Sequence, residues 1–175
     1  MQDDLSSDKA ELAKATPMVA VTVSDFDRKW ASLPCTCMEE LFSGRASGDT
    51  FRTRFCVQRV DPGDIRDAVK VWDKKTKKVS SAKGVKGGDL VWNVQFSVKD
   101  ASTLSNGNAY KILNYSHEGL GANFLGKAAN LWSDAAAAKK VEKQIATLMK
   151  FNVWVDAVVE RRNGWYYIKD TKLRA

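Results

Sequence analysis

The sequence predicts an all-β domain with one long helix, in the form of an OB-fold: a five-stranded Greek-key barrel with the helix between strands 3 and 4. Several segments alternate apolar and polar residues, which is typical of half-buried strands. One long amphipathic segment, residues 135–150, interrupts them. The sequence lacks the repeated strand–helix units that would indicate a doubly wound sheet. Three strands, a helix and two further strands follow the order of the OB-fold.

The N-terminal part of the chain has weaker signals. Residues 1–16 are polar without apolar periodicity, which is typical of a mobile tail. The segment MVAVTV at 18–23 predicts a short strand. Ser24 or Asp25 is a suitable N-cap for the helix that follows, and Pro34 ends that helix.

These signals divide the chain into three parts. Residues 42–49, FSGRASGD, are rich in turn-forming residues and lead into the main body. We therefore expect a mobile tail at 1–16, an N-terminal strand and helix extension packed on the barrel at 17–49, and the OB-fold domain at 50–175.

Four segments before the long helix have the composition or the alternation of strands. The segments TFRTRFCVQRV at 50–60 and AVKVWD at 68–73 are rich in β-branched and aromatic residues. The next residues, 74–89, carry lysines and glycines without apolar periodicity, which predicts a long exposed loop. The segment LVWNVQFSVKD at 90–100 has the clearest two-residue alternation, and AYKILNY at 109–115 is its expected partner.

The last part of the chain predicts a helix and a hairpin. Ser133 or Asp134 is a suitable N-cap for the helix at 135–150. The strand FNVWVDAVVE at 151–160 follows, and Asn163-Gly164 is the residue pair that favours a type I′ turn. In the final hairpin we expect Trp165, Tyr167 and Ile168 to close the barrel. We expect Arg161, Arg162 and Tyr166 to face outwards.

Composition limits the class of protein. The 175 residues are 44% hydrophobic with six tryptophans, enough for one packed domain. No apolar run is long enough for a membrane span, and the acidic start is unlike a signal peptide, so we expect a soluble, non-secreted protein. Three cysteines, an odd count, favour a reducing compartment. A net charge of +7 favours polyanions or an acidic protein surface as partners.

Four segments carry a resemblance to a known family: FRTRFCVQRVDPGD at 51–64, WNVQFSVKDAS at 92–102, GLGANF at 119–124 and KFNVWVDAVVERRNGWYYIKDTKL at 150–173. Over about residues 50–173 the chain resembles the C-terminal OB domain of the ciliate telomere end-binding alpha subunits, in the protection-of-telomeres family. The final hairpin is the most specific part of this resemblance.

The resemblance implies a non-catalytic component of a telomere end-binding, or capping, complex in the nucleus, at chromosome telomeres. In that family, two OB domains grip single-stranded telomeric DNA, and the third docks a beta subunit by receiving an extended segment of it. The chain leaves no obvious room for the two DNA-gripping domains. The expected partners are therefore a beta-type subunit and telomeric single-stranded DNA, bound directly or through the complex.

Two kinds of binding surface remain open on the residues themselves. Rings in an OB groove stack on bases while cations follow the phosphates, but aromatic and arginine side chains also anchor protein interfaces. The candidates for either surface are Trp72, Lys111, Tyr115, Phe124, Trp132, Trp154, Arg161, Arg162 and Tyr166. The alternative for most of these rings is the core, and for Trp92 the core is the better interpretation.

A basic loop is the second candidate surface. Its lysines could neutralise phosphates or attract an acidic protein segment, or they could simply keep the loop solvated. The residues of this basic loop are Lys74, Lys75, Lys77, Lys78, Lys83 and Lys86, with Lys70 preceding them.

We expect no metal, no cofactor and no catalytic residues. Cys35, Cys37, Cys56 and His117 lack the paired spacing of a zinc site, and Cys56 is expected in the core. Adjacent Ser, His and Glu at 116–118 do not make a triad, because such groups converge from different parts of a fold.

Overall fold

A computed structural model describes residues 24–104, 110–116 and 122–172. The predicted mobile tail at 1–16, the strand at 18–23, the turn SNGN at 105–108 and His117 lie outside the described residues. The helices are α2 (Asp25–Lys29), α3 (Met38–Phe42), the 3-10 helix η2 (Ile65–Ala68), α4 (Ala101–Leu104), α5 (Ala122–Leu125) and α6 (Ala135–Leu148). The strands are β1 (Thr50–Asp61), β2 (Val69–Asp73), β3 (Lys78–Ser81), β4 (Asp89–Lys99), β5 (Lys111–Ser116), β6 (Val155–Arg162) and β7 (Trp165–Thr171).

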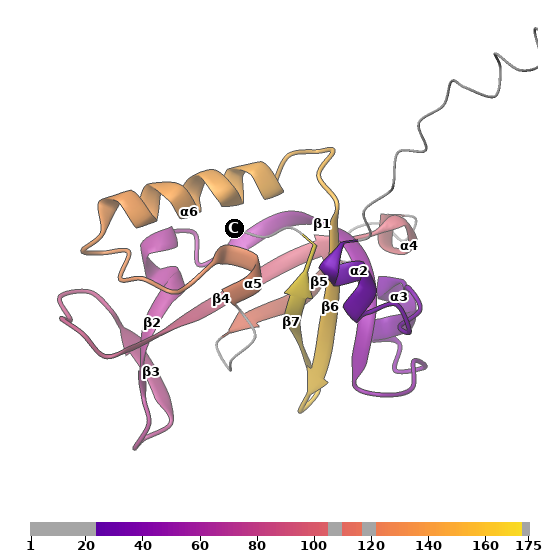
Figure 1. Ribbon diagram of the computed structural model, residues 1–175, viewed down its shortest axis with the longest axis horizontal. Helices are drawn as coiled ribbons and strands as arrows, with labels where there is room; N and C mark the ends of the chain where they lie inside the picture. The colour runs from indigo at the N-terminus through magenta and orange to yellow at the C-terminus, as the bar shows by residue number, and fades with distance from the viewer. Residues whose placement is uncertain (1–23, 105–109, 117–121, 173–175) are drawn as a thin grey trace, which may run out of the picture.

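The described strands form a sheet in the order β1-β6-β7-β5-β4-β2-β3, with an additional pairing between β1 and β4 (Figure 1). The long strand β1 pairs with β6 through its first half and with β4 through its second half. β5 meets β7 in parallel at the pair Asn114 and Tyr167. The pairings β1–β6, β6–β7, β7–β5, β5–β4 and β4–β1 therefore return to their starting strand.

The strand count differs from the prediction. The described part of the chain has seven strands where the sequence predicted five, and α6 follows the fifth strand in chain order. No segment of the sequence predicted β3, which lies inside the expected lysine loop. Its Ser81 pairs with Lys70 of β2, and its Lys78 pairs with Asp73. All four residues of β3 are exposed, so apolar alternation could not reveal this strand.

Local chemistry explains the ends of the other elements. Asp134 is the N-cap of α6, and its carboxylate accepts a hydrogen bond from the Ala137 N–H at 2.9 Å. Ser24 caps α2 in the same way, through the Asp27 N–H. Asn163 and Gly164 have φ of 50° and 80°, as a type I′ turn between β6 and β7 requires. These sequence predictions are confirmed.

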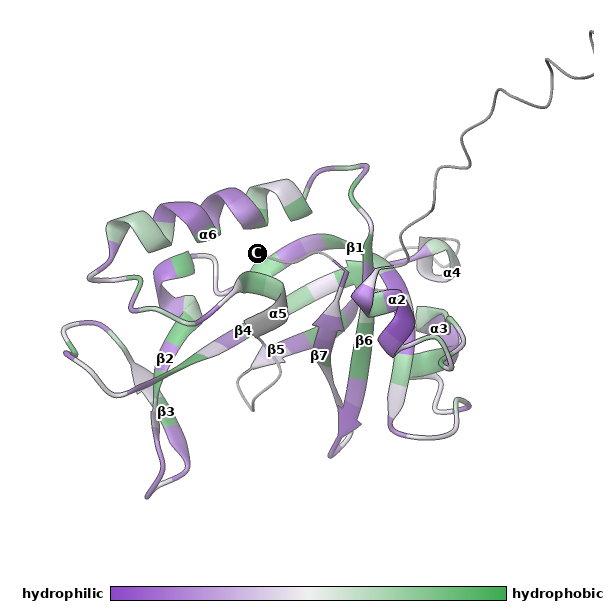
Figure 2. Ribbon diagram, viewed as in Figure 1, coloured by the Kyte–Doolittle hydropathy of each residue, from purple (hydrophilic) through white to green (hydrophobic). Residues whose placement is uncertain are grey.

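The core lies between α6 and the curved sheet. Figure 2 shows hydrophobic and hydrophilic residues interspersed along the strands and along α6. Phe55, Phe96 and Leu113 are fully buried, and α6 contributes Ala138, Val141 and Leu148. Trp92 and Cys56 are buried, as predicted. The predicted start of a strand at Phe151 is wrong: β6 begins at Val155, and Phe151 is fully exposed.

Hydrogen bonds attach the described part of the N-terminal segment to the rest of the fold. The Trp30 Nε1–H donates to Asp170 Oδ2 at 2.8 Å, and the Met38 N–H donates to Asp100 Oδ2 at 2.7 Å. The Tyr166 hydroxyl donates to the Leu41 carbonyl at 2.7 Å. Residues far apart in sequence thus hold α2 and α3 against the strands.

Among the described residues, no helix is both long and apolar enough to span a membrane.

Candidate functional site

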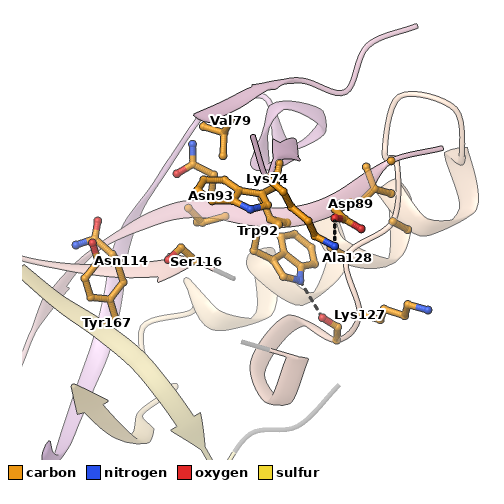
Figure 3. A pocket seen from close by; sticks show the side chains of 17 residues that line it. Lys74, Val79, Asp89, Trp92, Asn93, Asn114, Ser116, Lys127, Ala128 and Tyr167 are labelled. Atoms are coloured by element: carbon orange, nitrogen blue, oxygen red, sulfur yellow. Dashed lines mark hydrogen bonds and ion pairs between the residues drawn. The ribbon is translucent and has the colours of Figure 1, made fainter. Parts of the chain in front are cut away.

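A groove of about 1190 Å³ lies between the β2–β3 hairpin and the strands β5 and β7, with β4 as its floor. Figure 3 shows its side chains, which come from both walls and from the chain after α5. Its apolar lining includes Trp72, Val79, Leu90, Trp92 and Val94. Its polar lining includes Asn93, Asn114, Ser116 and Tyr167. A surface lined by apolar and polar side chains between two strand-bearing walls suits an extended ligand with alternating side chains.

The floor of the groove is fixed by Trp92. This side chain is 2% exposed, and its Nε1–H donates to the Gly126 carbonyl at 2.8 Å (Figure 3). Its ring centroid lies 5.9 Å from that of Tyr115. Trp92 therefore holds the segment after α5 against β4 and is too buried to stack on a base.

Trp72 provides the accessible ring of the hairpin wall. It is half-buried on β2, where it lies opposite Val79 of β3 and Asp89 of β4. Lys74 forms an ion pair with Asp89 at 2.9 Å in the same wall. Both Trp72 and Lys74 were candidates from the sequence, and the structure brings them together in the groove.

The opposite wall contains the junction of β5 and β7. Asn114 is 9% exposed, and its Oδ1 accepts a hydrogen bond from Gln95 Nε2 at 3.0 Å. Its Nδ2 donates to the Tyr166 carbonyl at 3.3 Å. The Asn114 amide thus joins three strands beside the groove. Sequence reasoning did not select Asn114, although a polar residue between Leu113 and Tyr115 was an available signal.

Tyr167 forms the rim above this junction. It is half-buried, and the guanidinium carbon of Arg162 lies 4.9 Å from its ring centroid. Glu160 forms ion pairs with Arg162 at 2.9 Å and with Lys169 at 3.2 Å. Arg162, a candidate from the sequence, therefore acts on the groove through the Tyr167 ring.

The predicted orientation of the final strand is confirmed for Ile168, which is 3% exposed, and is wrong for the three aromatic residues. Tyr166, expected to face outwards, is 6% exposed, whereas Trp165, expected in the core, is 55% exposed. The Tyr167 side chain is half-buried in the groove and is not in the core, although the Tyr167 backbone pairs with β5. The Leu41 carbonyl of α3 accepts a hydrogen bond from the Tyr166 hydroxyl, and the centroid of the Phe42 ring lies 4.5 Å from that of the Tyr166 ring. The helix α3 therefore selects which aromatic of the strand is buried.

Tyr115 and Phe124, proposed as exposed, are also core residues. Tyr115 is fully buried, and its hydroxyl oxygen accepts the Leu125 N–H at 3.1 Å. Burial raises the pKa of Tyr115 to about 12. Phe124 packs 5.5 Å from the Tyr115 ring. The short helix α5 covers this end of the sheet, which the sequence did not reveal, so neither ring can stack on a ligand.

The remaining ring and cation candidates lie outside the groove. Lys111 lies over the Phe42 ring at 5.4 Å, and Arg161 donates to the Gly48 carbonyl at 2.7 Å. Trp154 is 43% exposed near the start of β6. Trp132 is partly buried between two cations, with Arg66 at 4.3 Å and Lys83 at 4.8 Å from its ring centroid.

The basic-loop lysines lie on the β2–β3 hairpin and the segment that follows it. All six basic-loop side chains are exposed: Lys74, Lys75, Lys77, Lys78, Lys83 and Lys86. The turn of the hairpin is fixed by Asp73, which accepts hydrogen bonds from the Lys75 and Thr76 N–H groups. These hydrogen bonds lower the pKa of Asp73.

Within the described ranges, no group of three or more His, Cys, Asp or Glu side chains could hold a metal ion. Cys35 and Cys37 are exposed thiols, and Cys56 is buried.

Comparison with known proteins identifies relatives along nearly the whole chain, while no family model matches it. The chain is 50% identical to the telomere-binding protein subunit alpha of Sterkiella nova and 48% identical to that of Stylonychia mytilus, over 99% and 98% of its length. A telomere-binding protein homolog of Euplotes crassus is 35% identical over 99% of the chain. The chain spans only 37%, 36% and 37% of the lengths of these three relatives.

The fold has a counterpart among solved structures. A chain in the crystal structure of fission yeast Pot1 and Tpz1 superposes with a TM-score of 0.56 at 12% identity, covering 80% of this chain and 91% of that one. The chain therefore shares its sequence with part of the ciliate telomere-binding proteins and its fold with a chain of the Pot1 and Tpz1 structure. More particularly, the chain is related to the telomere-binding protein alpha subunits of ciliates, as its sequence predicted.

Proposed function

We propose that this chain is a non-catalytic part of a telomere end-binding complex and that its groove docks an extended segment of a beta-type partner subunit. Its relatives are named as alpha subunits of telomere-binding proteins, which implies a complementary subunit. We further propose that the complex acts in the nucleus, at chromosome telomeres. The observation that carries the docking proposal is the groove between the hairpin and the β5–β7 junction.

The domain organisation is part of the proposal. We propose that the strands β1, β4, β5, β7 and β6, which pair in a closed series, are the five-stranded barrel predicted from the sequence. On this assignment α6 connects the third and fourth barrel strands, and the β2–β3 hairpin is an insertion between the first and second. Residues 17–49 are then the extension and residues 50–175 the OB-fold domain.

The lining of the groove favours a peptide over a nucleic acid. Single-strand binding relies on a series of accessible rings, each contributing about 1–3 kcal/mol per stacked base. Three of the rings that the sequence proposed for this role, Tyr115, Phe124 and Tyr166, are buried. Within the groove, the partly exposed rings are Trp72 and Tyr167, which lie at opposite walls of a surface with aliphatic, amide and charged side chains. Such a surface offers pockets for alternate side chains of an extended chain.

The test is calorimetric titration of the beta-type subunit of the same organism into this chain. Trp72→Ala removes the accessible ring of the groove, and as an interface anchor its loss should weaken binding about thirtyfold. Trp154→Ala is the matched control, because that tryptophan is exposed outside the groove. Equal effects of the two substitutions would contradict docking in the groove.

Direct binding of G-rich telomeric single strands is the second candidate function, favoured by Trp72 beside Lys74 in one wall. Fluorescence anisotropy with telomeric and scrambled strands, at low and physiological salt, separates the two. Salt-resistant binding that prefers the telomeric strand and requires Trp72 would replace the docking proposal. Weak binding that salt abolishes would indicate nonspecific attraction to the hairpin lysines.

A further inference from the structure

The β2–β3 hairpin carries most of the excess positive charge of the chain. Residues 70–89 contain seven lysines and two aspartates, a net charge of +5 within a chain of net charge +7. Asp89 already pairs with Lys74, and Asp73 accepts hydrogen bonds from the backbone of its own turn. Lys75, Lys78 and Lys86 form no ion pair with any described carboxylate.

The hairpin also ends in an open strand edge. β3 is the last strand of the described sheet, so one of its edges has no neighbouring strand. Its four residues are all exposed, and Val79 is 45% exposed next to Trp72. Figure 1 shows β2 and β3 projecting from the body of the molecule, which leaves room beside β3.

The base of the hairpin is held in place. The Asn130 Nδ2 donates to the Ala82 carbonyl at 2.9 Å and to the Val85 carbonyl at 3.0 Å. Ala82 is 1% exposed. Gly88 has φ of 96°, and a Cβ there would lie 3.1 Å from Val71 Cγ1. The edge is thus presented by an anchored element, which lowers the entropic cost of adding a strand.

From the charge and the open edge, we propose that β3 binds an acidic, extended protein segment as an additional strand. Main-chain hydrogen bonds along β3 would hold the segment, Val79 would contact an apolar side chain, and the surrounding lysines would pair with its carboxylates. Lysines on an edge strand repel a second copy of the same basic edge. The same charges attract an acidic strand, so they select the partner while preventing self-association.

A nucleic acid fits this edge less well. Trp72 is the sole aromatic residue between positions 70 and 89, and it faces the groove and not the β3 edge. Bases would therefore have no ring beside β3 on which to stack. Backbone donors and acceptors, in contrast, match a peptide strand.

The test uses a fluorescent synthetic peptide of alternating glutamate and valine, titrated into the whole chain at low and physiological salt. The comparison peptides are its glutamine–valine analogue and a version methylated at alternate backbone nitrogens along one edge. We expect the acidic peptide to bind, and the other two to bind at least about tenfold more weakly, because they lack the charge or the hydrogen bonds. Hydrogen exchange at residues 78–81 should slow when the acidic peptide is bound.

Matched variants locate the site. Lys75→Gln, Lys78→Gln and Lys86→Gln together should weaken binding of the acidic peptide about tenfold. Lys139→Gln, Lys140→Gln and Lys143→Gln remove the same charge from exposed positions of α6 and should change it less than about twofold. Equal losses in both variants, or unchanged binding of the methylated peptide, would overturn the proposal. Tighter binding of a thymidine oligonucleotide that displaces the peptide would also overturn it, in favour of a nucleic acid.

The test of this inference is independent of the proposed function, because the synthetic peptide requires no beta-type subunit, although Val79 lines the groove as well as lying on β3. Trp154→Ala and the α6 variant serve as controls for the two surfaces separately.

Discussion

Tyr166→Phe tests the orientation of the final strand, on which the groove depends. The substitution keeps the ring, which packs 4.5 Å from Phe42 and 6.3 Å from Phe51, and removes the hydroxyl that donates to the Leu41 carbonyl. A buried hydrogen bond contributes about 1 kcal/mol, and leaving its acceptor unpaired adds to that loss. We expect the free energy of unfolding to fall by about 1 to 2 kcal/mol.

Urea denaturation followed by tryptophan fluorescence measures this change, and the corresponding fall in Tm is roughly 3 to 6 °C for a domain of this size. Tyr167→Phe is the control, because Tyr167 is half-buried in the groove, and its loss should be less than about 0.5 kcal/mol. A larger loss for Tyr167→Phe than for Tyr166→Phe would refute the assignment, since it would place Tyr167 in the core.

Three further predictions concern the rest of the fold. Phe55→Ala should cost about 3 to 5 kcal/mol of unfolding free energy in urea denaturation, whereas Phe151→Ala, at a fully exposed ring, should be nearly neutral. Gly164→Ala should cost about 1 kcal/mol in the same assay, because its φ of 80° strains any residue with a Cβ. The Ser24 hydroxyl and Lys172 lower the pKa of Asp27 from 3.8 to about 2, so its stabilising contribution is complete above pH 4 and is lost as the pH falls towards 2. Asp27→Asn should therefore flatten the pH dependence of Tm in that range, and an unchanged slope would contradict the assigned hydrogen bonds.

The elements that the sequence predicted correctly depend on local chemistry. β4 alternates in burial from Trp92 to Lys99, Asp134 starts α6, and Asn163-Gly164 permits the positive φ of the hairpin turn. In each case, residues a few positions apart determine the structure. The prediction therefore needed no knowledge of the partners of these elements in space.

The errors occur where distant segments decide the outcome. The run Trp165, Tyr166 and Tyr167 places an aromatic on both faces of the strand, so alternation cannot choose between them. The Leu41 carbonyl determines which aromatic is buried, because it accepts a hydrogen bond from the Tyr166 hydroxyl. Leu41 and Tyr166 are 125 residues apart in sequence. Likewise β3 is exposed on both faces, and its pairing with β2 determines its place.

The groove could be predicted only in part for the same reason. Trp72 and Lys74 were identified by residue type, but their place beside Tyr167 requires the hairpin to fold back next to the β5–β7 junction. Asn114 and Ser116 line the opposite wall without any distinctive motif. A residue type can suggest a contact, whereas the neighbours of that residue follow from the sheet order.

The β5–β7 junction also connects the fold to the proposed docking. Asn114 and Tyr167 are the described pair between these parallel strands, and the Asn114 amide reinforces it through Gln95 and the Tyr166 carbonyl. The other strand pairings of the closed series each contain several residue pairs. The junction is therefore the least extensively paired part of the series, and the groove lies directly over it. An extended segment bound there would contact both strands at once, so partner binding should strengthen the pairing that closes the sheet.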